Sequence, residues 1–242
     1  QAGELLQYQV EHRLKGAARA QVAARLAMIQ LMNRKPDRAI AVLHATRIND
    51  LAGELREQRL LLEARAQSDI GRHELALDLV SNITGREVVR LRSDIYWAAR
   101  RWREAAEQIE LLYGERWRDP APLTAEEKAD ILRAAVGYAL AQDSLGLGRF
   151  RDKYAAKMSG PDDRAAFEVA MKPASGSVAA FSQLAKMAAS VDTINGFLRD
   201  MKARFADTLA QAPPPHGVTA PDPTPTGTLP RIVGASRAGG TR

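Results

Sequence analysis

The side chains best suited to metal binding or proton transfer are the four histidines, His12, His44, His73 and His216. A metal pair on a helix needs two histidines three or four residues apart, and no two of these have that spacing. The chain contains no cysteine, which excludes thiolate ligands, cysteine nucleophiles and disulfides. His73 fits better as a turn residue that packs between two helices. The sequence therefore predicts no metal site and no cofactor.

Other patterns that could support catalysis are explained more simply by helix structure. Gly146-Leu147-Gly148 has too few glycines for a dinucleotide loop and lacks the lysine and hydroxyl of a phosphate-binding loop. The adjacent carboxylates Glu126-Glu127 and Asp162-Asp163 fall at predicted helix starts, where negative charge complements free backbone amides. No serine lies in a Gly-x-Ser-x-Gly turn. We therefore predict a protein that is not an enzyme and has no small-molecule substrate.

The composition is typical of a helical globular protein. The 242 residues are 45% hydrophobic, 26% charged and 5% aromatic. A formal charge of +6 makes nucleic acid a partner to consider. However, cations alternate with acids, as at Arg56-Glu57 and Arg103-Glu104, which is typical of a solvated helix surface. Apolar stretches such as residues 26–32 fall far short of the roughly 20 residues of a membrane span, so we expect no transmembrane segment.

Helical spacing is already present at Leu5, Leu6 and Val10, soon after Gln1. We interpret the chain as a piece of a longer bacterial protein in which residues 1–20 form a helix that continues from a preceding repeat. The full length of that protein and its compartment, cytoplasm or cell envelope, stay open.

Apolar residues recur at helical spacing along most of the chain, interrupted by clusters of residues that stop helices. Thr84 with Glu87, and Thr124 with Glu127, match the capping box, in which a hydroxyl and a carboxylate satisfy free amides at a helix start. Three segments each read as a helix, a tight turn and a second helix, and a fourth around residues 134–150 is weaker. The three segments are residues 24–46, 60–80 and 88–112.

Each second helix opens with a small residue followed four positions later by a larger apolar one. Antiparallel helices joined by a short turn approach closely where the residue at their crossing is small. We therefore assign the helix crossings to Ala39, Ala76, Ala105 and Gly146.

The turn Gly71-Arg72-His73-Glu74-Leu75-Ala76 resembles that of the tetratricopeptide repeat, and Arg101-Trp102-Arg103-Glu104-Ala105-Ala106 is similar. The resemblance implies an all-α solenoid of antiparallel helix pairs over residues 21–158. Spacings of 37, 29 and 41 residues between the small residues depart from a regular period. More loosely, the chain resembles large exported or envelope-associated alphaproteobacterial repeat proteins that end in a proline-rich tail.

The remainder of the chain is expected to close the stack and then to lose structure. Helices are predicted over residues 164–171, 178–189 and 194–205, the last with Asp192 as a cap, and residues 161–211 are interpreted as a helical cap on the end of the solenoid. From Ala212 onward, seven of the chain's 12 prolines occur and no aromatic residue does, which predicts a disordered tail over residues 212–242.

In the family, the first helix of each pair lines the concave face. The resemblance therefore implies a groove of cations and aromatic platforms suited to an extended peptide with carboxylate groups. Our principal hypothesis is a scaffold that binds a protein or peptide of unknown identity in this groove. The alternatives are a structural arm of a larger envelope or assembly protein and nucleic-acid binding through the basic surface. The predicted groove residues are Arg25, Arg65, Arg90, Trp97, Lys128 and Tyr138.

Overall fold

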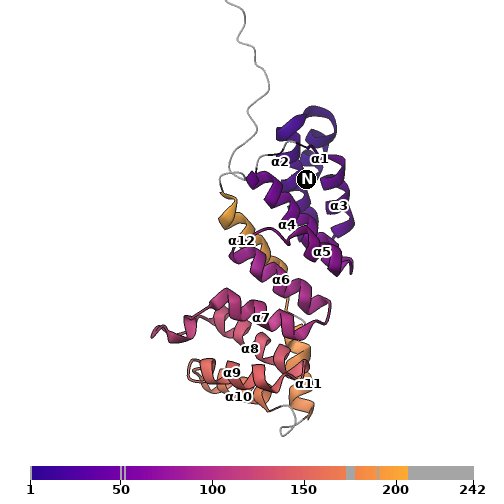
Figure 1. Ribbon diagram of the computed structural model, residues 1–242. Coiled ribbons are helices and arrows are strands. Elements are labelled where there is room, and N and C mark those ends of the chain that lie inside the picture. The colour runs from indigo at the N-terminus through magenta and orange to yellow at the C-terminus, as the bar shows by residue number, and fades with distance from the viewer. Residues whose placement is uncertain (1, 50, 52, 173–177, 190, 207–242) are drawn as a thin grey trace, which may run out of the picture. The chain divides into compact units, whose positions relative to one another are not determined.

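The computed structural model describes residues 2–49, 51, 53–172, 178–189 and 191–206. The chain divides into two compact units, Gln1–Gln211 and Ala212–Arg242, and all of the described residues belong to the first. The predicted disordered tail thus lies outside the described residues. Within the described part the fold is all-helical, with twelve α-helices and no strand (Figure 1).

The first nine α-helices are α1 (Ala2–Tyr8), α2 (Gly16–Met32), α3 (Pro36–Ala45), α4 (Gly53–Asp69), α5 (His73–Leu79), α6 (Arg86–Ala98), α7 (Trp102–Tyr113), α8 (Ala125–Leu140) and α9 (Ser144–Tyr154). Three more follow, α10 (Pro161–Met171), α11 (Val178–Ala189) and α12 (Ile194–Arg204). A π-helical segment, Gln9–Arg13, follows α1, and a short 3₁₀ turn, Arg116–Arg118, lies between α7 and α8.

The N-terminal segment differs from the single helix that we predicted over residues 1–20. The π-helical segment ends at Arg13, and Leu14 has extended backbone angles. α2 then begins at Gly16, so the last residues of the predicted segment belong to the first hairpin. Val10 packs with Val22 and Leu26 in a small apolar cluster that holds the N-terminal segment on α2.

Four consecutive hairpins, α2–α3, α4–α5, α6–α7 and α8–α9, are closed by the same backbone turn. In each turn one residue has a positive φ, between 54° and 84°, and the next residue donates its N–H to the carbonyl five positions earlier. This closure satisfies carbonyls that a helix end leaves free. The positive-φ residues are Arg34, Gly71, Arg100 and Gln142.

The small residues at the predicted crossings all lie in the interior. Ala39 and Ala76 are fully buried and Ala105 is 1% exposed, each five residues after the positive-φ residue of its turn. Gly146 comes only four residues after Gln142, so the buried face of α9 is shifted by one position relative to its turn. A Cβ on Gly146 would lie 2.9 Å from the Tyr138 ring on α8, which requires a residue without a side chain.

Of the two predicted capping boxes, the structure contains the second. At the start of α8 the Glu127 amide donates to the Thr124 hydroxyl over 3.2 Å, and the Thr124 amide donates to the Glu127 carboxylate over 2.7 Å. The Thr84 prediction is wrong, because α6 begins after Gly85, whose φ of 134° places it outside helical geometry, and no side chain caps that end. The Glu87 carboxylate instead binds Arg204 of α12.

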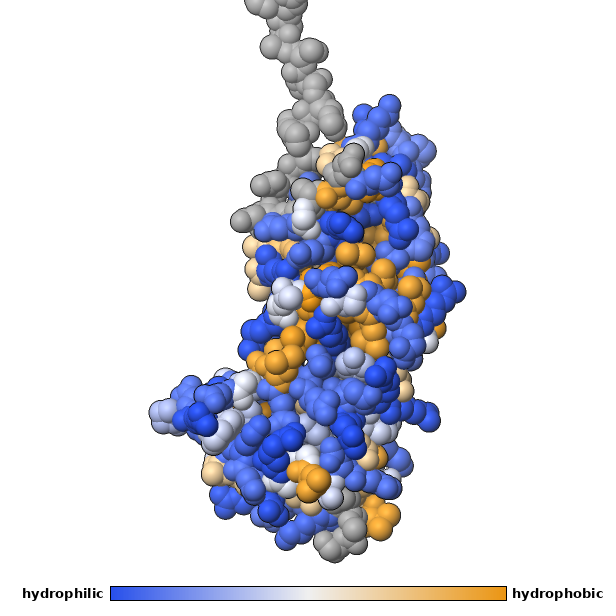
Figure 2. Space-filling view, in the orientation of Figure 1, coloured by the Kyte–Doolittle hydropathy of each residue, from blue (hydrophilic) through white to orange (hydrophobic). Residues whose placement is uncertain are grey.

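Two apolar cores meet at α6. The first core is built by α2 to α6 together with α12, and the second by α6 to α11. Val88, Leu91 and Ile95 of α6 point into the first core, whereas Trp97 at its end packs in the second. On the face drawn in Figure 2, more hydrophobic surface shows over α2 to α5 than over α7 to α9.

The last three helices do not form one cap on the end of the hairpins, as we had predicted for residues 161–211. α10 and α11 do pack on α8, and through Phe167 and Leu184 they complete the second core. α12, in contrast, contacts α2 and α6 and lies on the first core. In this position the apolar face of α12 is buried in the first core and removed from water.

Candidate functional site

Helix α12 has one sharply apolar face, and that face is covered by the first hairpins. Its buried side chains are at most 4% exposed and follow the spacing of one helix face. The residues between them are half-buried or exposed, with Lys202 and Ala203 facing outward. α12 therefore sits on α2, α4 and α6 in the way a bound amphipathic helix sits on a receptor. Its buried residues are Ile194, Phe197, Leu198, Met201 and Phe205.

The first core contains just two buried aromatic rings among the described residues, one from α12 and one from the residue directly after it. These are Phe197 and Phe205, at 2% and 1% exposure. The hairpins themselves contribute mainly alanine, leucine and valine to this core. The hairpins thus contribute aliphatic side chains to this core, and the segment of α12 adds its two aromatic rings.

The N-terminal end of α12 is fixed by two arginines of the hairpins. Arg34, in the α2–α3 turn, forms an ion pair with Asp192. Arg65 of α4 donates to the Thr193 hydroxyl over 2.9 Å, and its guanidinium lies 5.8 Å from the centre of the Phe197 ring. Asp192, the predicted cap, also accepts a bond of 3.0 Å from the Ile194 amide, although the residue at the N-cap position of α12 is Thr193.

The other end of α12 is fixed by Arg204. Its guanidinium pairs with Glu57 of α4 and Glu87 of α6, and it donates to the Thr84 carbonyl over 2.9 Å. Because Arg65 lies near the end of α4 and Glu57 near its start, α12 runs in the opposite direction to α4. We call the surface of α2, α4 and α6 that α12 covers the inner groove. Its polar edge consists of Arg34, Glu57, Arg65, Glu87 and Arg90.

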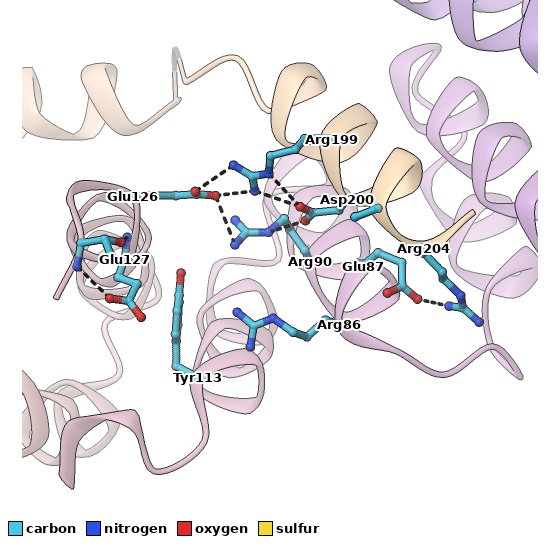
Figure 3. Close-up of a pocket in the computed structure, with 11 residues that line it drawn as sticks. Arg86, Glu87, Arg90, Tyr113, Glu126, Glu127, Arg199, Asp200 and Arg204 are labelled. Atoms are coloured by element: carbon cyan, nitrogen blue, oxygen red, sulfur yellow. Dashed lines mark hydrogen bonds and ion pairs between the residues drawn. The ribbon is translucent and has the colours of Figure 1, made fainter. Parts of the chain in front are cut away.

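Four side chains join the middle of α12 to α6 and α8, and we call them the clasp: Arg90, Glu126, Arg199 and Asp200 (Figure 3). Arg199 binds both carboxylate oxygens of Glu126, over 2.7 and 2.8 Å. Arg90 contacts Asp200 over 3.1 Å and Glu126 over 3.6 Å. Such a bidentate arrangement fixes orientation as well as charge.

The clasp borders a cleft of about 420 Å³. Positive and negative groups along the cleft are equal in number, so it presents no net charge to an anionic ligand. The cleft lies between α12 and the hairpins. The charged residues that line it are Arg86, Arg90, Arg199 and Arg204, with Glu87, Glu126, Glu127 and Asp200.

The electrostatics of the clasp favour the charged forms. The hydrogen bond from Arg199 lowers the pKa of Glu126 below its usual value of 4.5, against a smaller effect of burial. Burial lowers the pKa of Arg90, but the charge and hydrogen bond of Asp130 outweigh it, so this pKa is raised overall. Asp130 receives 2.8 Å and 2.6 Å bonds from Arg90 and from the hydroxyl of Tyr113. The groove arginine is therefore held in place from the hairpin side.

A second set of ion pairs links α4, α6 and α8 beneath the groove. Asp94 of α6 lies 3.6 Å from Arg65 and 2.7 Å from Arg133 of α8. Arg65 also pairs with Asp69 over 3.0 Å. The side chains of Arg65, Asp94 and Arg133 are at most 10% exposed, whereas that of Asp69 is 27% exposed. Asp94 and Arg133 therefore support the hairpin stack from beneath the groove.

The structure brings two of the six predicted groove residues, Arg65 and Arg90, to the inner groove. Lys128 pairs with Asp163 and the Ser159 carbonyl, over 2.8 and 2.7 Å, at the start of α10. Arg25 is half-buried on α2.

The two predicted aromatic platforms are not open surfaces. Trp97 and Tyr138 are 7% and 1% exposed, so that part of the prediction is wrong. Trp97 packs edge-on against Trp102, and the Tyr138 hydroxyl donates to Glu110. Both rings pack in the second core, and the spacing of residues in the sequence does not show which aromatic rings that core takes up.

Sequence reasoning missed the role of α12 and of the acidic residues that receive it. The apolar spacing of residues 194–205 was visible, but nothing in the sequence showed which surface that face would cover. Glu126 was explained as a helix-start charge, and Glu87 as a capping residue. In the structure both carboxylates bind arginines of α12.

The described part of the chain contains no group of three or more His, Asp or Glu side chains placed to hold a metal ion. None of its helices combines the length and apolar character needed to cross a bilayer. Glu127, the other predicted acid of the pair with Glu126, is held by the capping box and by Arg116 over 2.9 Å.

Comparison of the chain with protein-family models, with curated proteins and with solved structures gave no match.

Proposed function

We propose that this protein is a non-enzymatic interaction scaffold whose inner groove binds a helical segment of a protein partner. The observation that carries the proposal is the packing of α12, which adds two aromatic rings to an otherwise aliphatic core while ion pairs hold its ends and middle. A surface that combines apolar pockets for aromatic anchors with a charged edge has the composition of a protein-binding site.

Repetition of one hairpin geometry supports this proposal. Four hairpins share their turn, and their first helices α2, α4, α6 and α8 are linked in succession by apolar contacts and ion pairs. In a tetratricopeptide-like solenoid such helices line one face and hold it rigid, which limits the entropy lost when a partner binds. On that ground we propose that this chain is a tetratricopeptide-like solenoid.

The test is a display screen of peptides against the full chain and two full-chain variants. The open variant carries Phe197→Asp and Met201→Asp, so that α12 can no longer bury its apolar face. The edge variant adds Arg34→Glu, Glu57→Arg and Glu87→Arg to the open variant, which reverses the charges at both ends of the groove. Circular dichroism of each variant checks that the hairpins keep their helix content.

We expect the open variant to enrich a family of peptides that the edge variant does not retain. Leu145→Asp is the matched control, because Leu145 is 86% exposed on α9 and lies outside the groove. If the folded open variant enriches no peptides beyond those that an unrelated protein of equal net charge enriches, the scaffold proposal is wrong.

A further inference from the structure

The side chains of α12 show which residue types the inner groove accepts at each position. Resting on the proposed function, we propose that the partner segment is an amphipathic helix with the side-chain pattern of α12, and that α12 is a built-in competitor which this partner displaces. The structure supports both halves of the inference, the pattern and the competition, through separate observations.

The pattern follows from what each position of α12 contacts. Aromatic rings are required at the positions of Phe197 and Phe205, because the hairpins contribute no buried aromatic ring of their own to the first core. Met201, fully buried between them, sets a third apolar position. An acidic side chain at the position of Asp200 meets Arg90, which Asp130 holds from behind.

The ends of the pattern set the direction in which the helix lies. An acid at the N-terminal end meets Arg34, and an arginine at the C-terminal end meets Glu57 and Glu87. A helix in the reverse direction would place like charges together at both ends. Like charges in contact disfavour the wrong orientation, so the groove selects a helix that runs opposite to α4.

The competition follows from how α12 is held. Most of its polar contacts with the hairpins are ion pairs at the groove edge, several of which involve half-exposed side chains such as Arg34, Glu126 and Arg199. Ion pairs of this kind contribute little and weaken with salt. α12 has 11 residues, too few to be a stable helix without a surface to pack on.

Displacement must therefore be an exchange of one helix for another. Leaving the groove empty would expose the floor of the first core together with Phe197 and Phe205, which water disfavours. A partner helix that repeats the pattern removes this cost, because it covers the same floor. The free energy of binding is then the difference between the partner helix and α12, increased by any further contacts that a longer partner makes.

The alternative occupant with the same chemistry is α12 of a second copy of the chain. The short connection from α11, which ends at Ala189, to Ile194 keeps α12 near its own groove at high effective concentration. A swapped dimer would gain no new contact in the groove over the monomer. The observations thus favour a partner protein that supplies contacts beyond the groove.

The test uses a fluorescent peptide with the sequence of residues 191–206, added to the full chain and to the open variant. Fluorescence anisotropy should show at least about tenfold tighter binding to the open variant than to the unmodified chain, because α12 competes only in the latter. A peptide with both phenylalanines replaced by alanine should bind the open variant at least about tenfold more weakly. The Leu145→Asp chain should bind the peptide as the unmodified chain does.

A charge exchange distinguishes binding in the groove from non-specific binding to a loosened open variant. A peptide with Asp192→Arg and Arg204→Glu should bind the open variant poorly and should recover on the edge variant, whose groove ends are reversed. A simple loss of structure cannot produce this recovery. Size-exclusion chromatography of the chains without peptide checks for the swapped dimer, which would overturn the proposed partner class.

The inference and the proposed function fail in different ways. If peptides from the display screen bind the chain but the α12 peptide binds the open and unmodified chains equally, the scaffold proposal holds and the inference is wrong. If neither the α12 peptide nor any displayed peptide binds a folded open variant, the proposed function is wrong as well.

Discussion

The two cores of this protein solve the same packing problem with different side chains. The second core is filled by aromatic rings from its own hairpins and their flanking residues, including Trp97, Tyr138, Phe150 and Tyr154. Phe150 lies 5.6 Å from the Tyr138 ring and 4.9 Å from the Tyr154 ring, measured between centroids. The first core is built from smaller side chains and receives its buried phenylalanines from α12.

This difference teaches where a binding surface can exist in a stack of similar hairpins. The second core is filled by aromatic rings of its own hairpins, whereas the aliphatic first core receives its two aromatic rings from a separate segment, so it is there that we propose a partner helix to bind. The edges differ in the same sense. In the second core Glu110 is enclosed by Tyr138, Arg149 and Lys153, all from neighbouring hairpin helices, while the edge of the first core points its charges at α12.

The largest expected effect compares one phenylalanine from each core. Phe150→Ala should destabilise the chain by about 3–5 kcal/mol, because a fully buried ring leaves a cavity among other aromatic rings. Phe197→Ala should lower the global free energy of unfolding by clearly less, since α12 can leave the groove before the hairpins unfold. Urea denaturation followed by circular dichroism measures both. Equal losses would show that α12 is an integral part of the fold, against our comparison.

The next effect tests whether both cores share the close helix crossing. Ala76→Leu in the first core and Ala105→Leu in the second should each cost about 1–3 kcal/mol, because both alanines are buried where paired helices meet. Thermal unfolding gives the two values, with Ala41→Leu, at an exposed site of α3, as the control. A change no larger than that of Ala41→Leu would mean that the crossings are misassigned.

A smaller effect concerns the way α6 closes the end of α5 in the first core. Arg92 donates to the carbonyls of Val80, Ser81 and Ile83, over 2.5, 3.1 and 3.0 Å. Arg92→Met should cost about 0.5–1.5 kcal/mol, because it leaves these carbonyls without that donor while water can still reach the exposed one at Ser81. Arg56→Met, at an exposed site of α4, is the matched control. Similar melting temperatures for the two variants would contradict a structural role for Arg92.

The smallest effect is a pH dependence confined to α12. Because the pKa of Glu126 is lowered in the folded protein, its contribution is complete above the usual value of 4.5 and is lost as the pH falls from there through the lowered pKa. Arg199, Arg90 and Arg86 face this carboxylate, and Asp200 lies beside it. Hydrogen exchange should show faster opening of α12 in that range, by an amount corresponding to under about 1 kcal/mol.

The matched variant for the pH test is Glu126→Gln, which keeps the shape of the side chain and removes its charge. Its α12 amides should exchange faster at neutral pH and change less on acidification than those of the unmodified chain. The amides of α8 and α9 in the second core serve as the internal reference. If α12 of the Glu126→Gln variant keeps the full pH response, the clasp does not hold α12.

The sequence by itself determined the local structure of this protein. Apolar spacing, turn residues and capping patterns depend on neighbours within a few positions, so they identified the helices, the hairpins and the small buried residues Ala39, Ala76 and Ala105. Local rules failed where a distant group competed. Glu87 was predicted to cap a helix, but its carboxylate binds Arg204. The positive φ angles of three turns occur at Arg34, Arg100 and Gln142, where no glycine predicts them.

Only the tertiary structure decided which surface each apolar face covers. Trp97 and Tyr138 could have lined a groove, but the second core required their volume. α12 could have closed the end of the hairpins, but its apolar face is buried in the first core, to which the hairpins contribute no aromatic ring. Burial is shared among segments far apart in the chain, so its outcome depends on the volumes and charges that all of them offer at once.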